Sequence, residues 1–476
     1  MGARTGKEYV AGLRDGREVW LDGQRVDDVT EHPALAGALE TMADLYDLQH
    51  ECADVCLTAD PETGQPVNLS HVVPRSRDDL VRRHGALRRT AEHTVGLMGR
   101  TPDYLNVTVA GFAGRTDVWG ALGNEEGAEH LVAFHRELAQ RDLALTHTIV
   151  HPTVDKRVPE VEAADGNVAL HKVGETEHGV IVRGARVLAT LAPFADELMV
   201  YTGQPIPQEA LAYALSFCVP MSTPGIKVLC RDSYSSDGNR FDHPLSSRFD
   251  EQDAFVIFDD VEVPYERVFI DGNVEVYNKV MTAGWVANVM QQTTIRAHVK
   301  LQFAYELATR MAKVVAATDA ATNEMLGELW TYVELTRAAL VAAEADASDC
   351  GNGTWFCDER PFRALRPTLP HWFPRVSEIL LLLGSHNLLA APTRAELDDP
   401  ALAPLLRTYL QGADGIEAEE RVKLFRAAWD FTGSALGSRN ELYERFYLAS
   451  AARTYQLAHL AAQREIGESL VDRVLA

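Results

Sequence analysis

The sequence has few cysteines and no stretch typical of a secretory signal. Six Cys are spread over 476 residues, and Met1–Glu8 contains no apolar segment. Cysteines in such a chain are expected to be reduced thiols rather than a disulfide framework. The sequence therefore predicts a cytoplasmic protein without disulfide bonds.

Positive charge and long apolar runs are also scarce. There are 45 Lys and Arg against 69 Asp and Glu, which gives a formal net charge of −24. Such a surface repels phosphate backbones and anionic lipids. The longest aliphatic run, 379–383, is far too short to span a bilayer. We therefore expect neither nucleic acid nor a membrane as a partner.

Several signatures of catalytic sites are absent. The sequence contains no P-loop, no GxGxxG fingerprint of dinucleotide binding, no GxSxG elbow and no HExxH zinc motif. His147 and His151 have the spacing of a helical metal pair, but Pro152 follows at once and no third ligand is identifiable. No metal site is predicted.

The apolar pattern changes along the chain from helical to strand-rich. In the first part, Leu35, Leu39, Met42 and Tyr46 recur with the period of a helix that buries one face. After Pro152 the chain turns to short segments that are rich in β-branched residues and bounded by turns. These segments are 179–187, 197–201, 226–230 and 253–263. They predict a small barrel or sandwich, in which the uniformly apolar 254–258 is a strand buried on both faces.

Helical periodicity returns from about residue 275. Leu329, Val333, Thr336 and Leu340 keep a helical period, and 449–476 predicts one long terminal helix. The order of helices, strands and helices argues for the α+β class with segregated layers. The chain is divided into an N-terminal helical domain, 1–147, a middle β domain, 148–272, and a C-terminal helical bundle with a tail, 273–476.

An ordered series of short segments runs through the chain from about residue 4 to about residue 450. Its members are Arg4–Tyr9, Gly99–Tyr104, Leu145–Thr148, His151–Lys156, Gly184–Pro193, Pro244–Glu251, Val261–Val268, Gly384–Thr393, Phe431–Ser434 and Ser438–Tyr443. In this order they resemble the oxygenase component of 4-hydroxyphenylacetate 3-monooxygenase. The common order makes the resemblance specific, although each segment alone is weak.

The resemblance implies an acyl-CoA-dehydrogenase-like fold with a middle β-barrel domain, assembled as a homotetramer. It also implies a two-component flavin monooxygenase. A separate NAD(P)H:flavin reductase supplies FADH2, and the oxygenase uses it with O2 to hydroxylate a phenol. The missing dinucleotide fingerprint agrees with this division of labour.

In this family, reduced flavin and O2 give a C4a-hydroperoxide, whose distal oxygen is attacked by the ring carbon ortho to the phenol hydroxyl. A cation and hydrogen-bonding groups at the phenol oxygen favour this attack. Arg100 is the candidate cation, because a guanidinium is always charged. Tyr104 would share its face of a helix, and His147 would titrate near neutrality and accept the phenolic proton. Arg100, Tyr104 and His147 are expected to form the catalytic phenol clamp.

The resemblance also points to residues for the flavin and for the far end of the substrate. The flavin candidates are His147, Thr148, Thr153, Val154, Asp155, Lys156, Thr190, Thr432, Gly433 and Ser434. The far end of the substrate is expected near Tyr201, Thr202 and Gly203, with Thr202 and Gly203 as the contact candidates, and the match to the family is weaker there. His151 stands where Asn is common in the family, and Thr153 where Gln is common.

The substrate class and two other functions stay open. The phenol is expected to resemble 4-hydroxyphenylacetate, a tyrosine derivative or a halogenated phenol, either free or attached to a carrier protein. One alternative is a relative of 4-hydroxybutyryl-CoA dehydratase, which keeps an iron–sulfur cluster beside FAD, although His298 is followed by no Cys until Cys350. The other is a non-catalytic subunit that binds flavin or another ligand.

Overall fold

A computed structural model describes residues 2–235, 239–282, 284–465, 467 and 469–476. Contacts divide the chain into two units. The first unit comprises 1–240, 246–300 and 347–357, and the second comprises 241–245, 301–346 and 358–476. The long helix α10 (Trp285–Val314) begins in the first unit and continues in the second.

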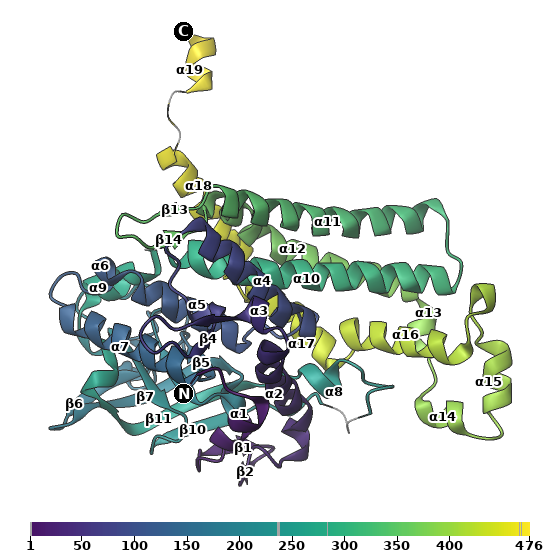
Figure 1. Ribbon diagram of the computed structural model, residues 1–476, viewed down its shortest axis with the longest axis horizontal. Coiled ribbons are helices and arrows are strands. Elements are labelled where there is room, and N and C mark those ends of the chain that lie inside the picture. Colours follow the sequence, from purple (N-terminus) through teal and green to yellow (C-terminus); the bar gives the residue numbers. More distant parts are fainter. Residues whose placement is uncertain (1, 236–238, 283, 466, 468) are drawn as a thin grey trace. The chain divides into compact units, whose positions relative to one another are not determined.

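The two larger β-sheets of the described chain lie in the first unit, which also holds two sheets of two strands each (Figure 1). The six-stranded sheet has the order β2-β1-β10-β11-β7-β6, and the four-stranded sheet has the order β12-β9-β8-β5. The strands of the larger sheet are β1 (Val19–Leu21), β2 (Gln24–Val26), β6 (His171–Glu175), β7 (Gly179–Thr190), β10 (Ile226–Cys230) and β11 (Asp253–Pro264). Those of the smaller sheet are β5 (Leu145–Thr148), β8 (Glu197–Val200), β9 (Leu215–Pro220) and β12 (Val268–Asp271).

The two sheets meet through aromatic side chains. Phe217 of β9 and Phe258 of β11 are buried, and their ring centroids lie 6.0 Å apart in an edge-to-face contact. A closed barrel, which the sequence predicted for this region, is not confirmed, because the strands form two separate sheets. The α+β class is confirmed.

The strands predicted from β-branched segments are present as β7, β8, β10 and β11. The prediction that 254–258 is buried on both faces is wrong. Val256 and Phe258 are buried, whereas Phe255 between them is 36% exposed. In β11 the side chains alternate between the core and the outer face of the sheet, as in a strand covered on one side only.

The first unit also contains helices, some of which pack against the two larger sheets. They include α2 (Ala36–Glu51), α4 (Arg77–His93), α5 (Pro102–Ala113) and α7 (Glu125–Arg141). Leu39, Met42 and Tyr46 of α2 are buried, as their spacing predicted. Helix α5 is almost wholly buried, and a Cβ on Gly111 would lie 2.2 Å from Nδ2 of Asn288 in α10. Glycine therefore permits the close approach of α5 to the first part of α10.

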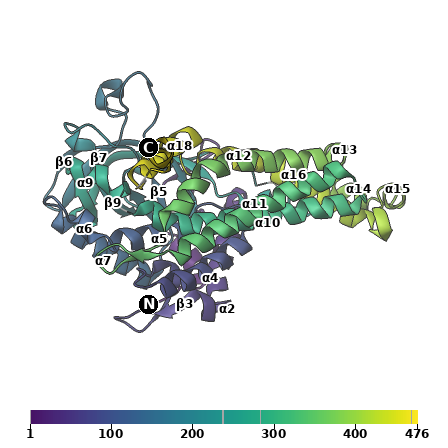
Figure 2. The same cartoon turned by 90° about the horizontal axis from the view of Figure 1, so that it is seen from above.

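The second unit is helical. Helix α12 (Glu359–Gly384) packs against α11 (Ala320–Ala345), α16 (Ala418–Thr432), α17 (Ala435–Phe446) and α18 (Ala451–Glu465). Figure 2 shows α11 and α12 running side by side, with the short helices α13 (His386–Leu389), α14 (Arg394–Asp398) and α15 (Ala403–Tyr409) at one end. Leu329, Val333, Thr336 and Leu340 of α11 are buried, as predicted.

The prediction of one terminal helix over 449–476 is wrong. Helix α18 ends at Glu465, and a separate helix α19 (Leu470–Leu475) begins after Ser469, whose side chain accepts a hydrogen bond from the backbone of Asp472. Gly467 lies between the two helices, where its low helix propensity favours an interruption.

Within the described part of the chain, no helix is long and apolar enough to cross a membrane. The strand-rich segment 148–272 falls in the first unit together with the N-terminal helices, except for 241–245. The three-domain division at 1–147, 148–272 and 273–476 stays a prediction.

Candidate active site

The candidate site lies where two parallel strands of the smaller sheet end. Strands β5 and β8 pair in parallel, with His147 opposite Met199, so the chain beyond each strand emerges at the same edge. Gly203, just beyond β8, lies against this exit: a Cβ there would stand 2.6 Å from the carbonyl oxygen of Ile149. Only glycine permits the two segments to approach so closely.

Four side chains form a continuous stack at this edge. The rings of Tyr104 and His147 stack with centroids 5.4 Å apart, and those of His147 and Tyr201 with centroids 5.3 Å apart. The guanidinium carbon of Arg100 lies 4.0 Å from the centroid of the Tyr104 ring. Arg100, Tyr104 and His147, expected from the sequence to form a phenol clamp, are therefore brought together. Tyr201, expected near the far end of the substrate, belongs to the same stack, which the sequence did not predict.

The start of α5 sets the position of Arg100. The helix begins at Pro102, so Arg100 precedes it, and the expected sharing of one helical face with Tyr104 is wrong. The guanidinium instead folds over the Tyr104 ring as a cation–π pair. The carboxylate of Glu251 accepts hydrogen bonds from the backbone N–H groups of Gly99, at 2.5 Å, and Arg100, at 2.9 Å.

His147 is held neutral. It is only 4% exposed, and its Nδ1 has no hydrogen-bond partner among the described residues. Burial, followed by the positive charge of Arg100, lowers the pKa of His147 well below its usual value. The expectation that His147 titrates near neutrality is therefore wrong. A neutral imidazole offers one donor and one acceptor, so His147 can make hydrogen bonds to a ligand without carrying charge.

Three threonine hydroxyls near the stack are used by the protein itself. Thr146 donates to the carbonyl oxygen of Thr190 at 2.6 Å, and Thr148 donates to that of Val187 at 3.1 Å. The hydroxyl of Thr190 donates to a carboxylate oxygen of Asp253 at 2.9 Å. For Thr148 and Thr190, both flavin candidates, the groups still available to a ligand are backbone atoms and hydroxyl lone pairs.

A cavity of about 460 Å³ opens beyond the two strands. Its lining comes from the segments that follow β5 and β8. The residues are His151, Thr153, Val154, Asp155, Lys156, Val158, Pro159, Glu160, Val161, Ala163, Gln204, Pro205, Ile206 and Pro207. Four of the flavin candidates, Thr153 to Lys156, are therefore on one wall. Asp155 forms an ion pair with Arg157, at 2.6 Å.

Buried polar atoms without partners among the described residues make this region a candidate binding site. Both ring nitrogens of His151 and the hydroxyl of Thr202 are buried and lack hydrogen-bond partners among the described residues. Burial and the charge of Arg186 lower the pKa of His151 to about 3, so its ring is neutral. Arg186 is itself buried in β7 and donates to the carbonyl oxygen of Ile149 at 3.0 Å. Buried polar groups of this kind are satisfied by a ligand or water, and the ring nitrogens of His151 fit the polar edge of a flavin.

The other three flavin candidates lie in the second unit, at the turn between α16 and α17. Thr432 ends α16, and the hydroxyl of Ser434 caps α17 by accepting from the backbone N–H of Gly437 at 3.0 Å. A Cβ on Gly433 would lie 2.4 Å from the Trp429 ring. The packing of Trp429 therefore explains a glycine at position 433 without any role in binding.

No group of three or more His, Cys, Asp or Glu side chains that could hold a metal ion occurs in the ranges that the structure describes.

Family comparisons cover nearly the whole chain. Residues 5–270 match the family "4-hydroxyphenylacetate 3-hydroxylase N terminal", and residues 278–476 match "4-hydroxyphenylacetate 3-hydroxylase C terminal". A 4-hydroxyphenylacetate 3-monooxygenase oxygenase component of Thermus thermophilus is 38% identical over 466 residues, which are 97% of this chain and 95% of that protein.

Two further relatives act on other phenols by name. A Streptomyces globisporus (3S)-3-amino-3-(3-chloro-4-hydroxyphenyl)propanoyl-[peptidyl-carrier protein] monooxygenase is 35% identical, covering 94% of this chain and 86% of that protein. The oxygenase component of a Rhodococcus 4-nitrophenol 2-monooxygenase is 34% identical, covering 93% and 85%.

Solved structures agree. The crystal structure of a 4-hydroxyphenylacetate 3-monooxygenase oxygenase component complexed with FAD and 4-hydroxyphenylacetate has a TM-score of 0.91 and 38% identity, covering 95% of this chain and 94% of that one. Fold, site and relatives together define a FAD-dependent aromatic monooxygenase that uses O2. The chain belongs to the 4-hydroxyphenylacetate 3-hydroxylase family.

More distant likenesses concern the fold alone. An archaeal 4-hydroxybutyryl-CoA dehydratase from N. maritimus has a TM-score of 0.85 at 17% identity, covering 98% of this chain and 96% of that one. A glutaryl-coenzyme A dehydrogenase has a TM-score of 0.52 at 11% identity, covering 83% and 84%. The acyl-CoA-dehydrogenase-like fold is thus confirmed, and the dehydratase alternative has support only from this shared fold.

Proposed function

We propose that this monooxygenase hydroxylates a phenol at the carbon ortho to its hydroxyl, with Arg100, Tyr104 and His147 around the phenol oxygen. The observation that carries the proposal is the stack of a guanidinium, a phenol ring and a neutral imidazole at the end of β5. A fixed cation beside neutral hydrogen-bonding groups favours an anionic oxygen over a neutral one.

Each of the three side chains has its own role. Arg100 carries the positive charge that draws the phenol toward phenolate, which pushes electron density onto the ortho carbon. His147 donates or accepts one hydrogen bond at the phenol oxygen, since its lowered pKa keeps the ring neutral. The hydroxyl of Tyr104 supplies a further hydrogen bond, and its ring holds the Arg100 guanidinium in place.

The flavin candidates of the first unit lie on β5, on the segment that follows it and at the end of β7. His147, Thr148, Thr153, Val154, Asp155, Lys156 and Thr190 are the candidates in the first unit, and Thr432, Gly433 and Ser434 are those in the second. Bound FADH2 supplies two electrons, so that one atom of O2 enters the ring and the other leaves as water. His151 supports this assignment, because both of its buried ring nitrogens lack hydrogen-bond partners among the described residues and could bond to the flavin.

The far end of the substrate lies near Thr202 and Gly203 in this proposal. The Thr202 hydroxyl is buried and has no hydrogen-bond partner among the described residues. It is therefore available to a polar substituent on the phenol ring. The substrate is either a free phenol, such as 4-hydroxyphenylacetate, a halogenated phenol or 4-nitrophenol, or a tyrosine-derived phenol attached to a carrier protein. The names of the Thermus and Rhodococcus relatives favour a free phenol. The name of the Streptomyces relative favours a carrier-bound phenol.

The partners follow from the family. An oxygenase component works with a separate reductase, which here would be an NAD(P)H:flavin reductase supplying FADH2. Assembly as a homotetramer is supported by α19, whose apolar side chains Leu470, Val471, Val474 and Leu475 are 62–83% exposed. Such side chains need an apolar partner surface, and a second copy would provide one. The cytoplasmic location stays a prediction.

A product screen tests the proposal. Chemically reduced FAD, O2 and a panel of free and carrier-bound phenols are supplied to the purified protein, and the products are analysed by mass spectrometry. The expected product is the ortho-hydroxylated phenol of at least one panel member. Oxidation of FADH2 without any hydroxylated product across the panel would contradict the proposal and favour a non-catalytic subunit.

A further inference from the structure

We propose that Glu251 is a positioning residue for Arg100. Glu251 lies at the end of the segment Pro244–Glu251, shortly before β11, and the reaction described above assigns it no role. It acts on the backbone that carries the guanidinium, and the inference rests on the proposed role of Arg100.

The contact is specific and buried. One carboxylate oxygen of Glu251 accepts hydrogen bonds from the backbone N–H groups of Gly99, at 2.5 Å, and Arg100, at 2.9 Å. Glu251 is only 1% exposed. The carbonyl oxygens of Glu251 and Gln252 both accept from the backbone N–H of Leu191, each at 3.1 Å. The backbone of Glu251 is therefore anchored to Leu191, just after β7, and this anchor limits where its carboxylate can lie.

The contact matters because Arg100 lies outside regular structure. The N–H groups of Gly99 and Arg100 precede α5, so no helical carbonyl accepts from them. Hydrogen bonds from N–H groups to a carboxylate are shorter and roughly twice as strong as bonds to a neutral acceptor. By holding two successive N–H groups, Glu251 fixes the direction in which the Arg100 side chain leaves the backbone, and thereby its place over Tyr104.

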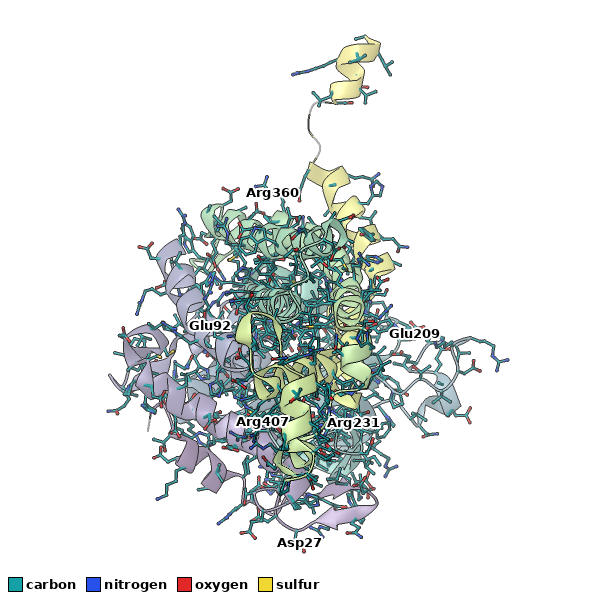
Figure 3. All side chains as sticks on the ribbon, turned by 90° about the vertical axis from the view of Figure 1, so that its right-hand side faces the viewer. Asp27, Glu92, Glu209, Arg231, Arg360 and Arg407 are labelled. Carbon is teal, nitrogen blue, oxygen red and sulfur yellow. The ribbon has the colours of Figure 1, made fainter. Side chains whose placement is uncertain are left out.

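The neighbouring residue Asp250 offers a matched control. Asp250 is 2% exposed, forms an ion pair with Arg231 at 2.5 Å, and accepts a hydrogen bond from the backbone N–H of Tyr234 at 2.7 Å. Figure 3 labels Arg231. Replacing Asp250 by Asn therefore disturbs an equally buried carboxylate one residue away, without touching Gly99 or Arg100.

The experiment compares Glu251→Ala, Glu251→Gln and Asp250→Asn with the parent in the reduced-FAD complex. The probe is 4-nitrophenol, whose anion absorbs visible light where reduced flavin absorbs little. An anaerobic pH titration then gives the pKa of the bound phenol. Amide hydrogen exchange at Gly99 and Arg100 is measured on the same proteins without the phenol.

We expect Glu251→Ala to lose exchange protection at both amides and to raise the pKa of bound 4-nitrophenol by about one unit, a tenfold change in ionisation. The kcat for hydroxylation falls about tenfold or more, with a smaller change in KM, since the phenolate is needed most in the transition state. Glu251→Gln keeps an acceptor oxygen and restores most of each effect. Asp250→Asn lowers thermal stability but leaves the phenol pKa unchanged.

Two results separate the failures. If the parent lowers the phenol pKa and Glu251→Ala lowers it equally, the positioning role is overturned while the proposed function stands. If the parent does not ionise the phenol, the proposed function of Arg100 fails. The positioning of its backbone is then decided by exchange alone: unchanged protection in Glu251→Ala would overturn it.

Discussion

The Arg100 guanidinium sits over the ring of Tyr104, with 4.0 Å between the guanidinium carbon and the ring centroid. The same ring stacks on His147. A guanidinium is always charged, and its contact with an aromatic face is electrostatically favourable. This relationship places a permanent cation beside two neutral polar groups, which is the arrangement that an ionised phenol requires.

Tyr104→Phe separates the ring of Tyr104 from its hydroxyl. The ring contacts with Arg100 and His147 are kept, so the free energy of unfolding changes by less than about 1 kcal/mol. Loss of the hydroxyl lowers the rate of hydroxylation about 10- to 100-fold. Thermal unfolding and product yield are measured together. A Phe variant as active as the parent would remove the hydroxyl from the mechanism.

His147 gives the reaction no titration step near neutrality. Its pKa is lowered well below the usual value by burial and by Arg100, so it is neutral throughout the physiological range. We expect the rate of hydroxylation of bound substrate, measured from about pH 6 to 8, to show no limb that depends on His147. A limb near pH 6.5 in the parent that disappears in His147→Asn would contradict this.

Gly203→Ala tests the close approach of the two chain segments beyond β5 and β8. Its Cβ would lie 2.6 Å from the carbonyl oxygen of Ile149, so the backbone must move, at a cost of about 1–3 kcal/mol in stability. The same shift displaces Ile149, which lies between the flavin candidates Thr148 and Thr153, so weaker FAD binding is expected. Gly174→Ala is the control, because no atom lies within 4 Å of its Cβ. Equal behaviour of the two variants, by calorimetry and flavin titration, would refute the constraint.

Asp103 makes stability depend on pH. It is buried, and burial raises its pKa to about 6. Because an unfolded Asp titrates near 3.9, the folded protein binds more protons between about pH 4 and 6, so stability falls as the pH rises through this window. Asp103→Asn keeps an acceptor for Gln292, which donates to Asp103 at 3.0 Å. Relative to this variant, the free energy of unfolding of the parent should fall by on the order of 2 kcal/mol between pH 4 and 7. The same pH dependence of this free energy in both proteins would contradict the assignment.

Local pattern predicted the elements of the fold better than their assembly. The strands β7, β8, β10 and β11 and the buried faces of α2 and α11 follow from the order of side chains alone. The pairing of β1 with β10 joins residues far apart in sequence, and no periodicity encodes it. For the same reason, a barrel and two sheets could not be told apart before the strand order was known.

The site was predicted in its chemistry but not in its electrostatics. Arg100, Tyr104 and His147 are brought together as expected. The neutral state of His147 depends on burial and on the charge of Arg100, which is distant in sequence. The ordinary pKa of histidine therefore gave the wrong protonation behaviour. Tyr201 directly precedes the predicted Thr202, and Glu251 ends a recognised segment, so position gave a signal for both. Neither contact follows from the sequence, because each joins separate elements.

Arg100→Ala is the most direct test of the central claim that a fixed cation drives phenol hydroxylation. With chemically reduced FAD, a phenol accepted by the parent and ¹⁸O2, the parent should place one labelled oxygen ortho to the hydroxyl for most of the FADH2 consumed. The variant should still oxidise FADH2, while labelled product falls about 10²-fold or more. A variant that couples FADH2 oxidation to hydroxylation as well as the parent would contradict the account.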